Sequence, residues 1–462
     1  MSSATLPAVP GAIVLTLALG EAPEAIPARN DVRDRACAPA ERIDGGAIDR
    51  IIRTRGGGAR IARLHTAAAG IRRIGHRHRG YSDLEQLTGV ARTFVVRTDR
   101  SVRLGELVDT LMEIPTVERA IPNYLSATPF DLAPSRARPV AEDTRPWDLV
   151  RADAALAREP GDDALILGVI DSGMPRAHPE FGRPLRQGYD TVRLTAGDVA
   201  AGVTLMGDLQ SPDRDPVDEF VGHGAGCAGI VSADGVGMHR GLAGAARLLP
   251  MRALGAARLP DRSGWVGLGA IADLDAALKL AVDLGARVLN LSFGTDDALL
   301  PPALPKPHAE TVAYAAARDV VMVAASGNNG REALFWPAAF PEVIAVGACD
   351  ADGRPAPFST RGSHVALAAP GVAIRTAALD GYQRATGTSF AAPFVAATAA
   401  LMLAHAARRA APLAPSQVRA LLMAASRPFA APAPGMGAGI LDALSALEAV
   451  EAAVDPDGPD DG

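Results

Sequence analysis

The run ALILGVID, residues 164–171, is apolar along almost its whole length and ends in a carboxylate. Similar apolar runs follow further along the chain, at residues 246–254, 287–294, 320–327 and 342–350. Two segments between them, residues 271–285 and 308–319, have helical periodicity. Unbroken apolar runs are typical of strands that are buried on both faces of a sheet. The pattern therefore predicts an α/β fold, a doubly wound and mostly parallel sheet with helices on both faces.

The overall composition is that of an ordinary globular protein and narrows the function little. The chain has 462 residues, of which 48% are hydrophobic and 21% charged, and this is ordinary for a globular protein of two domains. No run of eighteen apolar residues occurs, so we expect no membrane span. Cys37, Cys227 and Cys349 lack metal-type spacing, so neither a disulfide framework nor a zinc site is expected.

The first 130 residues have a different pattern. We expect strands and helices in the order βαββαβ, which predicts a small α+β ferredoxin-like domain. The expected strands cover residues 12–19, 59–67, 91–98 and 117–125, and the expected helices cover residues 46–55 and 102–113. The alternative for residues 12–19, a signal peptide, lacks a preceding Arg or Lys. A cytoplasmic location is therefore favoured over a secreted one.

Charge also separates the two parts. Residues 1–130 hold 18 Arg against 14 acidic residues, while the rest of the chain is acidic and brings the net charge to −6. This difference favours complementary surfaces within one protein over nucleic-acid binding. The loop at residues 71–80 holds His76 and His78 among arginines, and we interpret it as a solvated basic loop, not a metal site.

Polar residues with catalytic potential interrupt the apolar pattern. Asp171 ends the first buried run, and His223 lies in the glycine-rich stretch GHGAGCAGI. Ser389 lies at the start of GTSFAAPFVAATAALML, a small-residue stretch that predicts a buried helix, in which Pro393 is tolerated near the first turn. Each residue alone is explained as a helix cap or a core residue. Together they supply the nucleophile, base and orienting carboxylate that acyl transfer needs.

The stretches VIDSGM, GHGAGCAGI and GTSFAAPFVAA resemble the three catalytic motifs of the subtilisin-like serine proteases (subtilases), in that family's order. The resemblance implies that Ser389 is the nucleophile, His223 the general base and Asp171 the residue that orients the imidazole. VMVAASGNNG resembles the segment that carries the oxyanion-hole asparagine, which falls on Asn328. The implied activity is that of a serine endopeptidase.

The resemblance also implies where substrate binds. An extended peptide is expected between two edges, with a P1 pocket beside them. The implied substrate-binding residues are Ser263, Gly264, Trp265, Ser292, Phe293, Gly294, Ala324, Ala325, Ser326 and Phe335. Phe335 is expected at the pocket floor, where its ring would favour Ala, Ser or Leu over Phe or Tyr at P1. A cis peptide bond is expected at Trp336-Pro337.

The segment TVERAIPNYLSATP, residues 116–129, resembles the end of the family's inhibitory propeptide. This implies an inhibitory and chaperone domain at residues 1–130, a linker at 131–146 and a catalytic domain at 147–450. Residues 451–462 are expected to form an acidic disordered tail. A zymogen that cleaves itself within residues 126–146 follows from this organisation.

No cofactor is expected, and a structural calcium ion remains an open alternative. The loop at residues 232–241 is shorter than the calcium loop of secreted subtilisins. Asp213, Asp215 and Asp218 suit either calcium or a plain acidic loop. Cys227 falls where thiol-containing subtilases carry a cysteine. The expected partners are a polypeptide substrate and the chain's own N-terminal domain, with no nucleic acid and no membrane, and the protein is expected to be a monomer.

Two other functional classes fit the sequence less well. A pseudoprotease would bind peptides without turnover, but it has no need to keep all four catalytic residues. An α/β-hydrolase esterase requires the order Ser, Asp, His and a Gly-x-Ser-x-Gly elbow, whereas Ala391 replaces the last glycine here.

Overall fold

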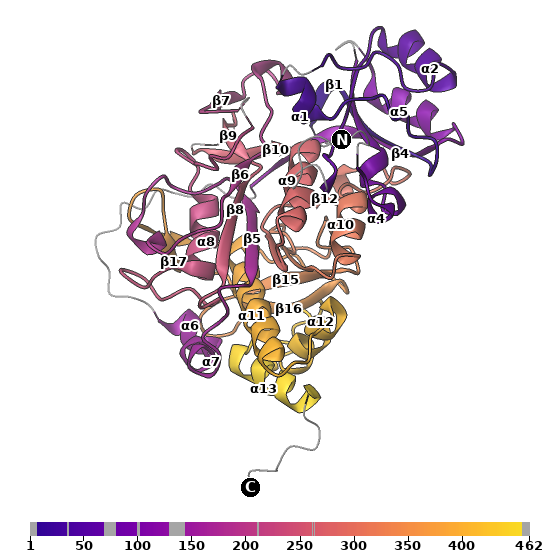
Figure 1. Cartoon of the computed structure of the whole chain (residues 1–462). Helices are drawn as coiled ribbons and strands as arrows, with labels where there is room; N and C mark the ends of the chain where they lie inside the picture. The colour runs from indigo at the N-terminus through magenta and orange to yellow at the C-terminus, as the bar shows by residue number, and fades with distance from the viewer. Residues whose placement is uncertain are drawn as a thin grey trace.

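The computed structural model describes residues 7–34, 37–68, 80–98, 102–128, 144–209, 212–260, 262 and 264–454, and the structural statements below concern these residues. A smaller N-terminal domain packs against one end of a larger α/β body, and the C-terminal helices lie at the opposite end (Figure 1). The basic loop at 71–79, most of the expected linker and Ser263 lie outside the described residues.

The N-terminal domain has the expected βαββαβ order. Its strands form an antiparallel sheet in the order β2-β3-β1-β4, which is the ferredoxin-like arrangement. The strands are β1 (Ala8–Leu17), β2 (Arg60–Arg63), β3 (Thr93–Arg97) and β4 (Val117–Ala127), and the two main helices are α2 (Ala47–Gly56) and α5 (Leu104–Met112). The short helices α1 (Arg29–Arg33) and α4 (Asp83–Leu87) were not predicted. Ser82 and Glu85 form a capping box that starts α4.

The larger body is built on a seven-stranded sheet in the order β16-β15-β13-β11-β5-β8-β6, and all its pairings are parallel. Its strands are β5 (Ile166–Asp171), β6 (Tyr189–Asp190), β8 (Arg247–Arg252), β11 (Val288–Leu291), β13 (Val321–Ala325), β15 (Val343–Cys349) and β16 (Val365–Pro370). The prediction of a parallel sheet is confirmed, while β6 and β16 were not predicted.

Both faces of this sheet are buried. In β5, Leu167 and Val169 belong to a core cluster with α8 (His223–Ser232) and α11 (Thr388–Arg408). Ile166 and Ile170 belong to another cluster, with α9 (Ile271–Asp283) and α10 (Ala309–Ala316). Successive side chains of a strand point to opposite faces, so an apolar residue is needed at every position. This explains the unbroken apolar run of the sequence.

Helix α11 is the long helix expected from the small-residue stretch. By length and composition it is apolar enough to cross a membrane, but 94% of its most apolar window is buried inside the protein. Among the residues that the structure describes, no other helix passes this test. The burial identifies α11 as the central core helix of the body.

The two domains share a second seven-stranded sheet, in the order β2-β3-β1-β4-β10-β9-β7. Strand β4 of the N-terminal domain pairs antiparallel with β10 (Val266–Ala270) of the body, and β10 forms a hairpin with β9 (Gly255–Arg258). Strand β7 (Thr204–Met206) completes the edge. One core cluster contains residues of both domains, so the N-terminal domain is firmly docked.

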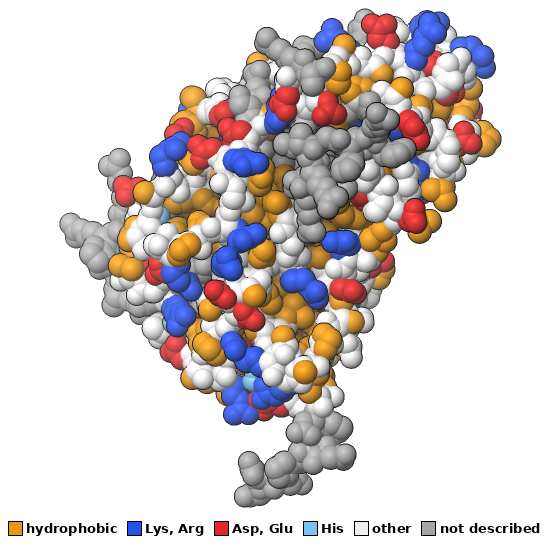
Figure 2. All heavy atoms as spheres, viewed as in Figure 1, with side chains coloured by type: hydrophobic (Ala, Val, Ile, Leu, Met, Phe, Trp, Pro, Cys, Tyr) orange, Lys and Arg blue, Asp and Glu red, His pale blue; other side chains and the backbone are white. Residues whose placement is uncertain are grey.

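Ion pairs across this interface follow the charge difference seen in the sequence. Three of them join an arginine of the N-terminal domain to a carboxylate of the body: Arg29–Asp273, Arg97–Asp198 and Arg119–Glu310. A fourth, Lys279–Glu85, runs in the opposite sense and is fully buried. On the face shown in Figure 2 basic and acidic side chains are interspersed.

The prediction of a disordered tail is wrong for residues 451–454. Helix α13 (Ala443–Val454) includes residues 451–454, where Glu451 forms ion pairs with Arg158 and Arg409. These pairs extend the helix beyond the point at which the acidic composition suggested an end. Residues 455–462 lie outside the described part of the chain.

Candidate active site

Asp171 and His223 form a buried pair at the carboxyl edge of the parallel sheet. Asp171 is the last residue of β5, and His223 is the first residue of α8, after Gly222 with φ 75°. His223 Nδ1 lies 2.7 and 2.9 Å from the two carboxylate oxygens of Asp171. An Nδ1–H that donates to this carboxylate leaves Nε2 with a free lone pair, which is the form a general base requires.

Gly224 allows α8 to approach β5 closely. A Cβ on Gly224 would lie 2.3 Å from the carbonyl oxygen of Gly173, so no other residue fits without movement. The Gly224 N–H donates a hydrogen bond to Ser172 Oγ at 2.9 Å. The glycine expected from the sequence is thus explained by packing behind the catalytic pair.

Asp218, considered above as a calcium ligand, instead supports the turn before His223. Its carboxylate accepts the N–H groups of Phe220, Val221 and Gly222 at 2.7–3.0 Å, and also the hydroxyl of Ser172 at 2.7 Å. A carboxylate with these donors is not available to a cation.

The other two acidic residues of that loop do not converge on Asp218. Asp215 pairs with Arg176, and Asp213 accepts the N–H of Asp215. Within the described ranges, Asp171, His223 and Cys227 are the only group of three or more potential metal ligands that lie close together. Since two of these residues form the catalytic pair, the group does not indicate a calcium site.

Ser389 is the second residue of α11 and lies at the same edge. Its hydroxyl donates to the carbonyl oxygen of Ser292 at 3.3 Å. Its own carbonyl accepts from Ser292 Oγ at 2.8 Å and from Cys227 Sγ at 3.3 Å. That carbonyl is free because the residue four positions later is Pro393, which has no N–H to complete the helix ladder.

Cys227 lies below the catalytic histidine, 3.9 Å from its Nδ1. Burial raises the pKa of the Cys227 thiol well above its usual range, and the nearby Asp171 carboxylate adds to the effect. The thiol is therefore protonated and acts as a packing residue and hydrogen-bond donor. All three cysteines of the chain are free.

Among the described residues, the side-chain amide of Asn328 makes hydrogen bonds through its oxygen but not through its nitrogen. Its Oδ1 accepts the backbone N–H and the hydroxyl of Thr388, both at 2.9 Å. Its Nδ2 is buried and has no hydrogen-bond partner within the described structure. The Thr388 N–H can only donate, which fixes the orientation of the amide and leaves Nδ2 as the free donor.

The three comparisons with known proteins agree with this geometry. The model described as "Subtilase family" matches residues 162–442, more than half of the chain. This chain belongs to the subtilase family. Its α/β fold class follows from that membership.

Two curated relatives illustrate the similarity. The thermophilic serine proteinase of Bacillus sp. (strain AK1) is 35% identical over 310 residues, which cover 64% of this subtilase and 65% of the relative. Subtilisin BL of Lederbergia lenta is 30% identical over 265 residues, which cover 56% of this chain and 83% of the relative. The alignment thus spans just under two thirds of the first relative's length.

Two solved structures are also similar. The prenylagaramide maturation protease PagA has 26% identity and a TM-score of 0.51, over 65% of this chain and 98% of that one. A protease from Pseudoalteromonas arctica has 22% identity and a TM-score of 0.55, over 65% and 94% of the two chains. The latter similarity supports the fold alone.

The strand that follows one expected substrate edge of the subtilase pairs with its own N-terminal domain. Strand β4 pairs with β10 through Leu125, Ser126 and Ala127, and the Thr128 N–H donates to Gly267 O at 2.8 Å. These contacts lie just after the predicted edge at 263–265, so the paired strand begins beyond Trp265. Trp265 itself packs against Phe220 and beneath the guanidinium of Arg258.

The other expected edge also contacts β4. Ser126 Oγ donates to the carbonyl oxygen of Gly294 at 3.2 Å. Ser292 and Phe293 are buried with the N-terminal domain docked, and the Phe293 ring meets His308 edge-on. The end of β4 therefore lies between β10, which follows the first predicted edge, and Gly294 of the second.

Phe335 lies beside the glycines of the expected P1 pocket. A Cβ placed on Gly327 would meet its ring at 2.6–2.8 Å, and a Cβ on Gly294 would meet it at 3.6 Å. The ring thus occupies the space between these two glycines. Phe335 and Trp336 form β14 (Phe335–Trp336), and the expected cis bond at Trp336-Pro337 is present.

Two of the residues predicted for the pocket wall make contacts within the protein core. Ala324 is fully buried in the core cluster that contains α9, and Ser326 Oγ donates to the carbonyl oxygen of Thr360. Gly327, which the prediction omitted, contacts Phe335 instead. Its φ of 109° favours glycine, but this backbone conformation is a property of the fold and gives no signal in the sequence.

Proposed function

We propose that this subtilase is a serine endopeptidase that hydrolyses peptide bonds in polypeptide substrates. The proposal rests above all on two free donors beside Ser389. The Asn328 Nδ2 is buried without a partner, and the Ser389 N–H lies in the first turn of α11, where no helical acceptor exists. Preorganised donors of this kind stabilise the oxyanion of a tetrahedral intermediate. A peptide-binding module has no use for them.

The first half of the reaction follows from the positions of these residues. The Ser389 hydroxyl turns from the Ser292 carbonyl to His223 Nε2, which removes its proton as the oxygen attacks the scissile carbonyl. The imidazolium that results is stabilised by the Asp171 carboxylate at 2.7 Å. Negative charge on the former carbonyl oxygen is received by Asn328 Nδ2 and the Ser389 N–H.

The second half returns the enzyme to its starting state. His223 gives its proton to the leaving amine, and the acyl group stays on Ser389. A water molecule then attacks the ester, with His223 again as the base. The bond between the acyl carbon and Ser389 Oγ breaks, His223 returns the proton to Ser389 Oγ, and the carboxylic acid leaves. Side chains supply every step, so the proposed chemistry requires no cofactor.

We further propose that residues 1–130 act as an inhibitory propeptide. The support is the bond from Ser126 to Gly294, a residue at which an extended substrate is expected, and the pairing of β4 with β10, which directly follows the other expected substrate edge. Strand β4 leads directly into the expected cleavage segment at residues 126–146. The N-terminal domain is thus the enzyme's first partner and first substrate, and the protein acts as a monomer.

Replacement of Ser389 by Ala tests both proposals. The parent protein should shorten by about 14 kDa, estimated from typical residue mass, and should react with a fluorophosphonate probe. The Ser389→Ala protein should stay at full length and remain unlabelled. Mass spectrometry of the mature N-terminus locates the cut.

The outcomes separate the two proposals. Hydrolysis by the Ser389→Ala protein would contradict the assignment of the nucleophile. If the parent is active but keeps its full length, the N-terminal domain is a permanent part of the enzyme and not a propeptide.

A further inference from the structure

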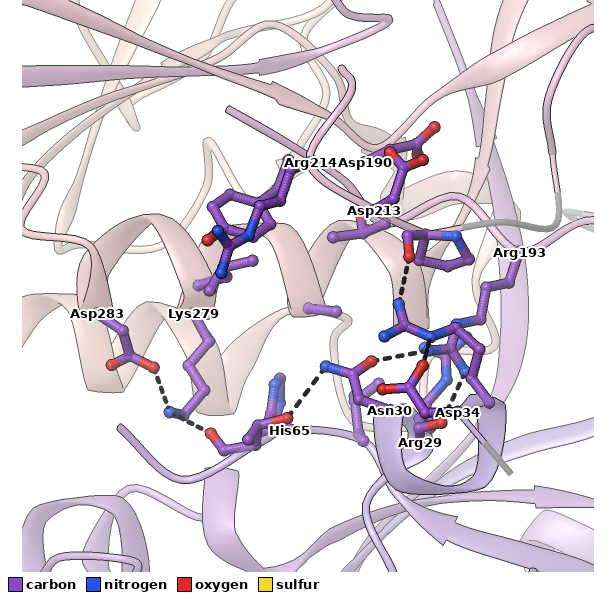
Figure 3. A pocket seen from close by; sticks show the side chains of 18 residues that line it. Arg29, Asn30, Asp34, His65, Asp190, Arg193, Asp213, Arg214, Lys279 and Asp283 are labelled. Carbon is purple, nitrogen blue, oxygen red and sulfur yellow. Dashed lines mark hydrogen bonds and ion pairs between the residues drawn. The ribbon is translucent and has the colours of Figure 1, made fainter. Parts of the chain in front are cut away.

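A cavity of about 420 Å³ lies between the N-terminal domain and the body, away from the catalytic residues (Figure 3). One wall comes from α1 and the segment after β2 in the N-terminal domain, and the other from the loop after β6, the loop near residue 213 and helix α9. The volume is in the range of small-molecule sites. Neither the triad nor the substrate edges explain this cavity.

Arginines gather at one end of the cavity. In Figure 3 Arg29 and Arg193 lie close together, with Asn30 and Asp34 beside them. Arg29 is paired with Asp273, and Arg33 is paired with Asp34. These pairs neutralise two of the three guanidinium groups.

Arg193 is the third, and it has no carboxylate partner. Its guanidinium donates to the backbone oxygen of Arg29 at 3.2 Å and to Asn30 Oδ1 at 2.8 Å. No acidic side chain of the described residues lies within ion-pair distance of it. Burial lowers the pKa of Arg193 to about 9, and the positive charge of Arg29 contributes to this shift. A cation held in this way is stabilised by any anion that enters.

His65 provides a second, independent observation. It lines the cavity, its exposed fraction is only 3%, and both its ring nitrogens are buried without a hydrogen-bond partner in the described structure. Figure 3 shows His65 between the arginine end and Lys279 at the other end. Buried polar atoms are almost always hydrogen-bonded, so an unpaired imidazole that lines a cavity points to a missing ligand.

The acidic residues of the cavity are mostly occupied. Asp190 pairs with Arg252, Asp283 pairs with Lys279, and Asp34 pairs with Arg33. Asp213 lies toward Arg214, away from Arg193 in Figure 3. Unpaired positive charge thus remains at the end formed by Arg193, and the imidazole of His65 can donate a hydrogen bond toward it.

We propose that this cavity binds a small oxyanion, a phosphate or carboxylate group, which Arg193 and His65 hold between the two domains. Guanidinium groups match the oxygens of both anions, and an imidazole N–H completes the site. The ligand contacts both domains, so it binds the docked arrangement and not the separated one. Binding therefore favours docking by mass action. If the N-terminal domain is a propeptide, as proposed above, the anion delays its release.

The test uses the full-length Ser389→Ala protein, which cannot cleave itself. Inorganic phosphate and citrate are titrated separately by calorimetry at constant ionic strength, with sodium chloride as the reference. We expect one saturable site and a higher melting temperature with at least one of the two anions, and the tighter one identifies the chemistry. Arg193→Gln in the same protein should weaken binding at least tenfold, because a neutral amide replaces the unpaired cation.

Arg331→Gln is the matched control, because it removes an exposed arginine of the body far from the cavity lining. Its affinity should equal that of the parent. His65→Ala supplies a second cavity variant if Arg193→Gln does not fold, because it removes the other group that holds the anion. The proposal is overturned if neither anion gives a saturable isotherm, or if the cavity variants bind as tightly as Arg331→Gln. These measurements need no turnover, so they remain informative even if the chain proves to have no protease activity.

Discussion

Asn328 performs two tasks with the two ends of one amide, and its replacement by Ala removes both. The Nδ2 end is the buried free donor, and the Oδ1 end accepts two hydrogen bonds from Thr388. Loss of the free donor leaves the oxyanion with the Ser389 N–H alone. Loss of the Oδ1 end leaves the first N–H of α11 without its acceptor.

Loss of the free donor should lower the rate of hydrolysis, and loss of the acceptor should lower the stability of the protein. Loss of one oxyanion-hole donor in subtilisin lowers kcat by about 10²–10³-fold, or about 2.7–4 kcal/mol, and we expect the same of its relative here. KM should stay nearly unchanged, because the donor acts only in the transition state. An unpaired buried N–H costs about 1–3 kcal/mol of stability, which corresponds to about 1–3 °C in melting temperature for a chain of this length.

Thr388→Val separates the two effects. It removes the hydroxyl that donates to Asn328 Oδ1 but leaves Nδ2 and the backbone N–H in place. We expect a small loss of stability and a much smaller fall in kcat than for Asn328→Ala. Steady-state kinetics on a peptide substrate and thermal denaturation provide the data. A variant Asn328→Ala that keeps its kcat and only raises KM would refute the oxyanion assignment.

Three further predictions follow from single residues. Phe335→Gly should raise kcat/KM for Phe at P1 by about tenfold to a hundredfold, since the ring fills the space between Gly294 and Gly327. A series of peptides that differ at P1 measures this change. A parent protein that already prefers Phe at P1 would contradict the prediction. Burial and the charge of Lys279 hold the pKa of His65 well below its usual range. The unfolded chain therefore takes up a proton near pH 6.5 that the folded protein excludes, and stability should fall below that pH by up to about 1.4 kcal/mol per pH unit. Melting curves of the Ser389→Ala protein with and without His65→Gln, from pH 8 to pH 5, should diverge only below about pH 6.5. Gly224→Ala should abolish hydrolysis, because its Cβ would meet the Gly173 backbone at 2.3 Å and push His223 away from Asp171. Activity near that of the parent protein would show that α8 can shift without loss of hydrolysis.

The sequence predicted the parallel sheet, and it singled out Asp171, His223 and Ser389, which the structure brings to one edge of that sheet, because local signals carry both. Strands buried on two faces need an apolar side chain at each position, as β5 demonstrates. The residues around Asp171, His223 and Ser389 are constrained by close backbone approaches, which require small residues within a few positions. Such constraints leave motifs that can be read without a structure.

Contacts between residues that are far apart in the chain could not be predicted from the sequence in this way. The sequence indicated that β4 is a strand but not that it pairs with β10, since an exposed edge offers the same backbone groups to any partner. The role of Asp218 was open between calcium and a plain loop, because the backbone N–H groups that occupy it become neighbours only after the turn has formed. The packing of Phe335 against Gly327 had no counterpart in the sequence, because only the fold brings these two residues together.

The opening of α11 breaks several local rules at once, and together these breaks position the nucleophile. Pro393 interrupts the helix ladder and frees the Ser389 carbonyl, which Ser292 and Cys227 then hold by two hydrogen bonds. Gly387 adopts a φ of 150° before the helix, and Asn328 holds the first N–H from outside. Pro393 gives up a helix hydrogen bond, and the other contacts need partners from separate segments of the chain, so a purely structural helix has no reason to combine these features. The combination is explained if the gain is catalytic: the backbone of Ser389 is fixed on both sides, while its hydroxyl and its N–H remain free to react.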